Sequence, residues 1–417
     1  MEQADLHEHL FRHEAGRMTA SLTRLFGVHN LALAEDVVQD AFARALDVWR
    51  LRGPPPNPSA WLMATARNRA LDLIRRERTA RTFAPELGRL LDSEWTARAV
   101  VDEAFSSDVV LGEQLRMMFS CCDPRLPEPA QIALILNILC GFGVAEIAAA
   151  FLESRAAVEK RITRGKRTLA QSSTLFDLSD TDFSSRCSAV QRALYLLFNE
   201  GYHGASATNA VRVELCGEAM RLSALLREHP ATRTPSTFAL SALMALHAAR
   251  LPSRLNESGD LLSLLEQDRS TWDRALIDEG RRLLEESAFG EVVTSYHLEA
   301  SIAAVHAAAP SLAVTNWDAI VRLYDQLARV APSAVVALNR AIAVAQRDGP
   351  DRGIEEIDSI PDRERLERYP FYPAARGELE QRRGNTAAAR TQFERALGLA
   401  RNDAERRYLQ KRLNALE

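Results

Sequence analysis

The 417-residue sequence has few lysines, no cysteine pair at CxxC spacing and no long apolar run. Its five cysteines, an odd number without regular spacing, do not match a disulfide framework or a zinc site. No stretch of about 18 apolar residues and no signal peptide is present, so we expect no membrane-spanning helix. Together these absences predict a protein of the reducing cytoplasm.

Motifs that bind nucleotides, metals or acyl groups are also missing. Gly165-Lys166 lacks the upstream glycine of a phosphate-binding loop, and no nucleophile elbow occurs. His7-Glu8 begins an HExxH-like pattern, but Phe11 stands where the second histidine should be. A solvated helix face is the favoured interpretation for these residues and for nearby His13 and Glu14. We therefore expect no enzymatic activity, no cofactor and no bound metal.

The residues that are abundant predict an all-α fold. Ala, Leu, Arg and Glu dominate, whereas strand formers are dispersed and alternating patterns are almost absent. Net charge is only −4, although a stand-alone DNA-binding domain usually has a strong basic excess. Basic charge is instead local. Of the three lysines, Lys160 and Lys166 lie in one predicted helix and Lys411 near the C-terminus.

Length and charge patterning predict four parts, because a chain this long can bury several cores. Residues 1–82 form a compact three-helix unit, and residues 83–111 an acidic, partly helical linker. Residues 112–172 hold a helix-turn-helix, and residues 181–417 a long series of amphipathic helices. Cys121-Cys122, at the start of the third part, are expected to be small packing residues rather than a metal or redox site.

The N-terminal part places two charged surfaces beside a rigid connector. A helix over residues 33–52 carries acids near its start, which suit either the helix dipole or docking of a basic partner. Prolines in Gly53–Pro58 predict a stiff, non-helical connector. Ser59 is expected to cap the next helix, with an inner stripe and an arginine-rich outer face that suits phosphates and unstacked bases. The inner stripe consists of Met63, Ala66, Ala70 and Leu73.

The stretch Ala130–Leu169 predicts a helix-turn-helix. A helix ending near Phe151 is followed by a break at residues 152–154, and Ser154 can cap the next helix. That helix has an apolar stripe of Val158, Ile162, Gly165 and Leu169. Its opposite face is small, polar and basic, as entry into the DNA major groove requires. A solvated face is the alternative interpretation of the same pattern.

Residues 181–417 read as a degenerate helical repeat, with turns near His229, Pro252, Pro310, Pro332, Gly349 and Pro373. Ala389 and Phe393 have the A-x-x-x-F spacing of a tetratricopeptide (TPR) second helix. Gly349 and Gly384 lie 35 residues apart, close to the TPR period of about 34. A repeat of this kind predicts a partner-binding surface, and a packed helical lid without a partner is an equal alternative.

In combination these segments resemble a known family. Ala34–Trp49, Asn57–Arg76 and Ala130–Leu169 resemble regions 2 and 4 of a bacterial sigma-70 family factor of the extracytoplasmic-function (ECF) type. Arg186–Gly204, Leu261–Gly280 and the TPR-like tail are similar to the ECF subgroup with a long C-terminal helical extension. The resemblance covers nearly all of the chain, and it implies that the protein directs RNA polymerase core to specific promoters.

The resemblance also implies three sets of site residues. Polymerase, through its β′ clamp helices, would be bound by Asp36, Gln39, Asp40 and Arg44. The −10 element would be recognised and opened by Asn57, Trp61, Asn68, Arg69, Arg75 and Arg76. The −35 element would be bound by Ser154, Arg155, Ala157, Lys160, Arg161 and Arg164. Implied partners are the polymerase core (β′ clamp helices and β flap), promoter DNA and a regulatory protein for the extension, with no membrane contact.

Some residues depart from the family pattern, and two other classes of protein fit part of the sequence. Leu152-Glu153 and Arg155 differ from the residues usual in the sigma turn, which affects base preference at −35. A TPR scaffold with a vestigial DNA-binding front is one alternative. A stand-alone helix-turn-helix regulator is another, although it would need a dimerisation element to match paired half-sites, and no clear one is present.

Overall fold

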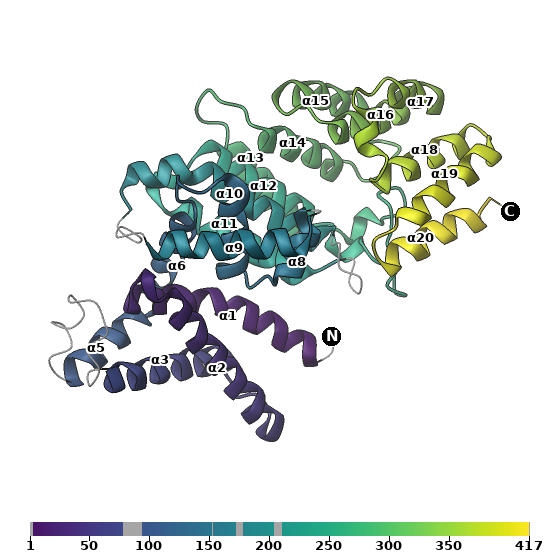
Figure 1. The fold of residues 1–417 in the computed structure, drawn as a ribbon. Helices are drawn as coiled ribbons and strands as arrows, with labels where there is room; N and C mark the ends of the chain where they lie inside the picture. The colour runs from purple at the N-terminus through teal and green to yellow at the C-terminus, as the bar shows by residue number, and fades with distance from the viewer. Residues whose placement is uncertain (1–2, 78–93, 152, 172–177, 204–210, 417) are drawn as a thin grey trace. The chain divides into compact units, whose positions relative to one another are not determined.

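The computed structural model describes residues 3–77, 94–151, 153–171, 178–203 and 211–416, and helices dominate all five ranges (Figure 1). These ranges contain no β-strand, only an isolated antiparallel bridge between Leu255 and Leu261. The all-α prediction is confirmed. The chain forms two compact units, which we call the N-terminal unit (Met1–Leu197 with Glu228–Thr232) and the C-terminal unit (Phe198–Arg227 with Arg233–Glu417). None of the described helices is both long and apolar enough to cross a bilayer.

The first half of the N-terminal unit is built from α1 (Gln3–Phe26), α2 (Leu31–Arg52), α3 (Pro58–Glu77) and α5 (Glu94–Ala104). Helix α2 begins two residues earlier than predicted, so its acids lie beyond the first turn. The helix-dipole explanation for those acids is therefore wrong. Part of the predicted linker is helix α5, whose Val101 joins the same core as α1, α2 and α3.

The buried face of α3 differs from the predicted stripe. Leu62, Ala66, Ala70 and Ile74 are fully buried, whereas Met63 and Leu73 are only partly buried. Asn57, rather than Ser59, caps the helix: its side-chain oxygen accepts from the Ala60 amide at 3.0 Å. The predicted stripe is therefore right at Ala66 and Ala70 and wrong at its two ends, where Leu62 and Ile74 replace Met63 and Leu73. Pro58 occupies the first helical position, where its missing amide hydrogen is harmless.

The second half of the N-terminal unit contains α6 (Ser107–Cys121), α7 (Glu128–Leu134), the π-helix η2 (Ile135–Leu139), α8 (Val144–Phe151) and α9 (Arg155–Ala170). The break predicted between α8 and α9 is present at Glu153 and Ser154. Cys121 and Cys122 are fully buried, as expected for packing residues. Burial raises the pKa of the Cys122 thiol to about 12, which leaves it protonated and unreactive at neutral pH.

Helix α1 joins the two halves, because it packs on α2 and α3 as well as on α6 and η2. The close approach of α1 to η2 requires a glycine. A Cβ atom on Gly16 would lie only 2.1 Å from the carbonyl oxygen of Leu139 in η2. Any side chain at this position would therefore push α1 away from the π-helix.

Gly16→Ala is expected to lower the free energy of unfolding by about 2 kcal/mol, because the added methyl group overpacks a backbone contact. Urea unfolding of the full chain measures the effect. Gly112→Ala is the matched control, since Gly112 is a helical glycine of α6 with open space around its Cα. The control should gain about 0.5 to 1 kcal/mol from helix propensity. Equal stability of both variants would contradict the close packing of α1 on η2.

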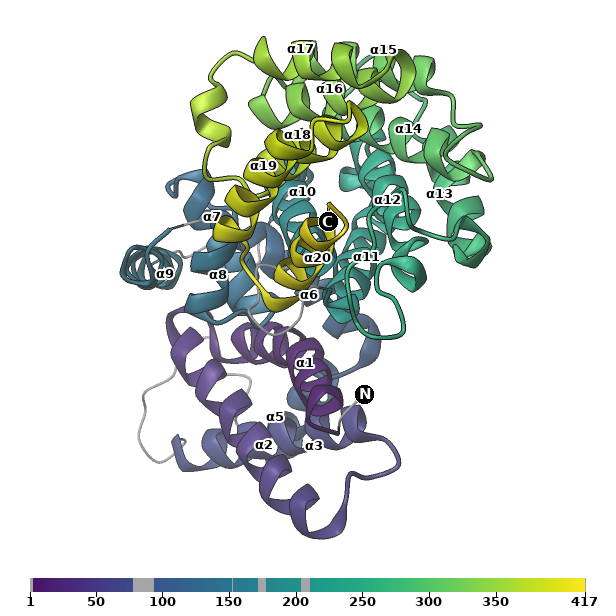
Figure 2. The same cartoon turned by 90° about the vertical axis from the view of Figure 1, so that its right-hand side faces the viewer.

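The C-terminal unit begins in the last turn of α10 (Asp180–Tyr202) and continues as a chain of helices, each packed mainly on its neighbours in sequence. In Figure 2 this unit runs from teal through green to yellow at the C-terminus. The helices are α11 (Val213–Glu228), α12 (Pro235–Ala248), α13 (Arg274–Glu286), α14 (Ser295–Ala308), α15 (Trp317–Val330), α16 (Ala334–Asp348), α17 (Pro350–Asp358), α18 (Phe371–Arg382), α19 (Thr386–Leu399) and α20 (Asp403–Asn414).

The repeat features of the tail appear where the sequence predicts them. Ala389 and Phe393 are buried in the core that α19 shares with α20. Gly349 and Gly384 both have positive φ, at 99° and 77°, which explains glycine at these helix ends. The turn predicted near Pro373 ends at Pro370, and Pro373 itself lies in the first turn of α18, where its missing amide hydrogen costs little.

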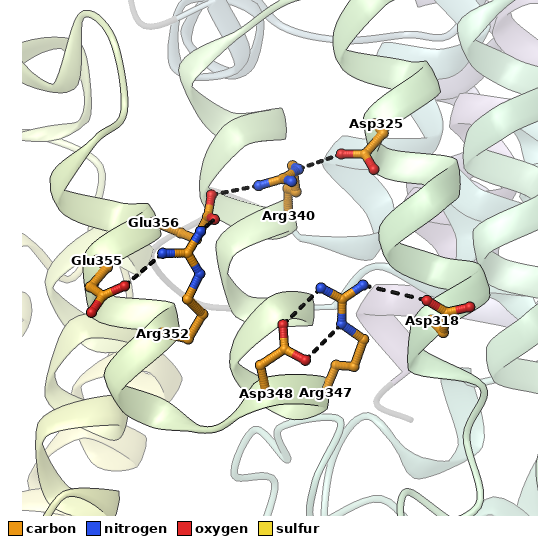
Figure 3. A network of polar contacts seen from close by, with 8 residues as sticks. All are labelled: Asp318, Asp325, Arg340, Arg347, Asp348, Arg352, Glu355 and Glu356. Carbon is orange, nitrogen blue, oxygen red and sulfur yellow. Dashed lines mark hydrogen bonds and ion pairs between the residues drawn. The ribbon is translucent and has the colours of Figure 1, made fainter.

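Helices α15, α16 and α17 are linked by a network in which every arginine meets carboxylates (Figure 3). Arg340 of α16 donates to Asp325 of α15 at 2.6 Å and to Glu356 of α17 at 2.5 Å. Arg347 and Arg352 also pair with acids of these helices. Since most of these side chains are partly exposed, each pair contributes about 1 kcal/mol at most. The network therefore aligns neighbouring helices more than it stabilises them.

Candidate nucleic-acid interface

Helix α9 presents one face to its core and the other to solvent. Its buried residues are Val158, Ile162, Gly165 and Leu169, which is the predicted stripe. The Ser154 hydroxyl accepts a hydrogen bond from the Ala157 amide at 3.3 Å, so the predicted cap is also confirmed. Leu152, in the turn, lies outside the described residues. The local pattern thus determines which face of α9 points outward.

The residues predicted for −35 binding lie on that outward face. Ser154, Arg155, Ala157, Lys160 and Arg164 are exposed. Arg161 is half-buried: it pairs with Glu153 at 2.6 Å and lies over the Phe151 ring at 5.8 Å. The arrangement leaves two long basic side chains, one helical turn apart, free to extend into a groove. Arg161 is more constrained and braces the turn against α8.

Helix α2 carries the residues predicted to bind polymerase. Asp36, Gln39, Asp40 and Arg44 are all exposed, while Val37, Val38, Ala41 and Ala45 hold the helix to its core. Further along the same helix Leu46 and Leu51 are exposed, Leu51 to 85%. An exposed polar stripe with unburied leucines at one end is typical of a protein-binding surface.

The residues predicted for −10 recognition lie in different surroundings. The side chain of Asn57 caps α3, so its oxygen is already engaged. Trp61 is half-buried, and its ring lies 5.5 Å from that of Trp49. Asn68 is exposed. The side chains of Arg75 and Arg76 lie outside the described residues.

One ion pair connects the −10 set with the polymerase set. The guanidinium Nε of Arg69 donates to Asp40 of α2 at 2.9 Å. With the charges of both side chains more than one-third exposed, the pair contributes about 0.2 to 1 kcal/mol. The structure thus places the predicted DNA-binding face of α3 directly beside the predicted polymerase-binding face of α2.

Two further ion pairs join the helix-turn-helix to the first helices of the unit. Lys166 of α9 contacts Glu35 of α2 at 2.6 Å, and Arg12 of α1 contacts Glu146 of α8 at 3.2 Å. Both pairs border a cleft of 850 Å³ that is also lined by Asp36 and Gln39. Both pairs are partly buried, and they add to the packing of α1 on α6 and η2. The sequence pattern showed Lys166 in α9 but not its partner.

Glu14 is a residue whose role the sequence did not indicate, since it was expected on a solvated face. Only 1% of it is exposed. Its Oε1 accepts from the Ser59 hydroxyl at 2.7 Å and from Arg17 at 3.0 Å, and it lies 2.9 Å from Nδ1 of His13. Ser59, the residue predicted as a cap, is therefore the link between α1 and the start of α3.

Comparison with known proteins identifies both halves of the N-terminal unit. Family models of sigma-70 region 2 and sigma-70 region 4 match residues 10–80 and 116–169. A third model, described as a family of unknown function (DUF6596), matches residues 186–288. An uncharacterized protein of Rhizobium meliloti (strain 1021) is 40% identical over 400 residues, which are 95% of this chain and 92% of that protein.

Regions 2 and 4 in one chain define an RNA polymerase sigma factor, the subunit that directs core polymerase to promoters. The chain belongs to the ECF type of the sigma-70 family and carries a C-terminal extension. Sigma factors are not catalytic; they bind the polymerase core and promoter DNA. A TPR scaffold or a stand-alone helix-turn-helix regulator is not favoured, because both sigma regions are present together.

Proposed function

We propose that the exposed face of α9 binds the −35 element through Ser154, Arg155, Ala157, Lys160, Arg161 and Arg164. The observation that supports this most directly is the exposure of Lys160 and Arg164 opposite a fully buried stripe. Basic side chains one turn apart on a capped helix match the major groove in width and charge. Arg161 is held by Glu153, and in this proposal it positions α9 by contacting the DNA phosphate backbone rather than the bases.

Region 2 supplies the other contacts in this proposal. Asp36, Gln39, Asp40 and Arg44 of α2 dock on the β′ clamp helices of the polymerase, and region 4 contacts the β flap. Asn57, Trp61, Asn68, Arg69, Arg75 and Arg76 recognise and open the −10 element. Opening DNA costs unstacking, and a face with polar and aromatic groups beside the connector offsets part of that cost.

The C-terminal extension regulates promoter use in this proposal, together with a protein partner, and the factor works in the cytoplasm where promoters are. Its helices, each packed on the next, provide an extended surface of the kind that binds partners. The four-part division at residues 82, 111, 172 and 181 remains a prediction. The modest net charge of −4 agrees with a factor that reaches DNA only with polymerase.

Run-off transcription with purified core polymerase and the full-length chain tests the proposal. We expect promoter-dependent transcripts with the chain and none with core polymerase alone. A gel-shift assay without polymerase should show weak binding, because few phosphate contacts are made, and for the same reason the affinity should fall only modestly as salt rises. Transcripts that do not depend on the chain, or tight promoter binding by the free chain, would contradict the proposal.

A further inference from the structure

Six residues of the C-terminal unit, which we call the cationic cluster, bring basic and aromatic side chains together. They come from the ends of α10, α12 and α14 and from the short helices η4 (Leu251–Ser253) and η5 (Arg269–Thr271) with their flanks. The cluster consists of Tyr202, His247, Arg250, Arg254, Arg269 and His306.

Aromatic rings hold these side chains in place. The Arg254 guanidinium lies 4.8 Å from the centre of the Tyr202 ring. The centre of the His247 ring lies 5.2 Å from the centre of the same tyrosine ring. Arg250 and Arg269 lie over the ring of Trp272, at 5.3 and 5.2 Å. Three guanidinium groups are thus oriented by stacking, which leaves their edges available for hydrogen bonds.

The hydrogen-bond acceptors of the three arginines are neutral. Arg250 donates to the side-chain oxygen of Gln267 at 3.3 Å, and Arg254 to the carbonyl of Tyr202 at 3.4 Å. Arg269 donates to the carbonyls of His306 and Ala309, at 2.9 and 3.0 Å. In the part of the chain that the structure describes, none of these arginines forms an ion pair, in contrast to those of Figure 3. No carboxylate of the described residues therefore neutralises these three guanidinium groups directly.

Several buried polar atoms of the cluster have no hydrogen-bond partner among the described residues. These atoms are Tyr202 Oη, His247 Nδ1, Arg254 Nε, Arg269 Nη2 and His306 Nδ1. Each can donate a hydrogen bond, the histidines in the appropriate tautomer. Arg269 is 5% exposed, so its unpartnered nitrogen has little access to solvent. Unsatisfied donors are rare in folded proteins, and their gathering in one place needs an explanation.

Repulsion among the positive charges of the cluster also favours binding of an anion. Burial, and then the neighbouring arginines, lower the pKa values of His247 and His306 to about 3, so both rings are neutral at neutral pH. Burial lowers the pKa values of Arg254 and Arg269 as well. Two acids act nearby. Burial and Glu214 raise the pKa of the Cys216 thiol to about 12, against the effect of Arg254. Burial and Glu299 of α14 raise the pKa of Tyr324 to about 12, against the effect of Arg250. An added anion would relieve the repulsion among the arginines.

We propose that the cationic cluster binds a small oxyanion ligand, a molecule that carries phosphate or carboxylate groups. Guanidinium edges and a tyrosine hydroxyl match the acceptor oxygens of such groups, and three arginine charges match a multivalent anion. A metal ion does not fit, because arginine is not a metal ligand and the described residues contain no group of metal-binding side chains. All cluster residues except His306 lie in the stretch 186–288 that matches the family of unknown function.

Isothermal titration of the full-length chain with pyrophosphate and, separately, with citrate tests the proposal. We expect one site for at least one of the two anions. Arg254→Gln and Arg250→Gln should each weaken it about tenfold or more, since each removes a charge-assisted hydrogen bond. Arg274→Gln is the matched control, because Arg274 is an exposed arginine of α13 in the same unit, and it should leave binding unchanged.

Pyrophosphate binding alone would assign a phosphorylated ligand, and citrate binding alone a polycarboxylate. Absence of binding for both anions at millimolar concentration would overturn the proposal, as would equal weakening by Arg274→Gln. If the cluster variants fail to fold, the thermal unfolding midpoint of the native chain is measured with each anion and with chloride at equal ionic strength. If neither anion raises the midpoint relative to chloride, the proposal is also overturned. These measurements need neither polymerase nor DNA, so their failure would leave the promoter-binding proposal untouched.

Discussion

Replacing Lys160 and Arg164 together by alanine is expected to lower promoter-dependent transcription about 30-fold or more, since each lost contact to DNA is worth about 1 to 3 kcal/mol. Both side chains are exposed on α9, opposite its buried stripe, so the substitution leaves the core intact. Stability of the folded chain should change by no more than about 0.5 kcal/mol per site. Multi-round run-off transcription at several salt concentrations measures the effect.

Arg192→Ala is the control for this substitution. It removes a positive charge from an exposed arginine of α10, whose side chain is 58% exposed and makes only a long ion pair at 4.0 Å with Glu128. The control should transcribe at the native rate. Binding of core polymerase by the double variant should also be retained, which separates a loss of DNA contact from a loss of assembly. A double variant as active as the control would show that α9 does not read the promoter.

Replacing Glu14 by alanine is expected to lower the free energy of unfolding by about 3 kcal/mol, because removing one member of a buried charged set leaves the others uncompensated. Arg17 and the Ser59 hydroxyl both lose the carboxylate that they contact. The loss should separate α1 from the start of α3. Urea unfolding of the full chain measures it, with Glu103→Ala, an exposed glutamate of α5, as the control.

The pH dependence of the Glu14 effect has a defined sign. Burial alone raises the pKa of this carboxyl group, but hydrogen bonds with His13 and Ser59 and the charge of Arg17 outweigh burial, so the pKa lies below its ordinary value of 4.5. A lowered pKa stabilises the fold at pH values above 4.5, and this contribution is lost as the pH falls through the folded-state pKa. The stability difference between the native chain and Glu14→Ala should therefore shrink in acid. A difference that grows in acid would contradict the assigned contacts.

Features that depend on nearby residues were predictable from the sequence. The cap at Ser154, the stripe of α9 and the glycine-ended helices of the tail each depend on residues within a few turns of one another. The inner face of α3 was predicted correctly at Ala66 and Ala70 but not at its two ends. Apolar residues occupy adjacent positions at both ends of the helix, as Leu62-Met63 and Leu73-Ile74. Periodicity alone therefore does not decide between a face with Leu62 and Ile74 and a face with Met63 and Leu73. Packing against α1, α2 and Val101 decides between them.

Contacts between distant residues were not predictable in the same way. Glu14 meets Ser59 across 45 residues, and Lys166 meets Glu35 across 131. A glutamate in a charged helix has the same local pattern whether it is buried or solvated, because burial is decided by what packs over it. The cationic cluster draws on four separate parts of the chain, each with an unremarkable sequence of its own. The exposed positions of the residues proposed on α2 and α9 could be predicted, because each set lies on one helix.

The packing of α1 on both sigma regions also implies an order in which the two regions fold during synthesis. A ribosome completes α1 and its region 2 partners well before the π-helix that covers Gly16 has been made. Region 2 can therefore collapse around its own core first, while the Gly16 side of α1 waits for residues up to Leu139. Until those residues leave the ribosome, the face of α1 that packs on α6 and η2 is without its partners.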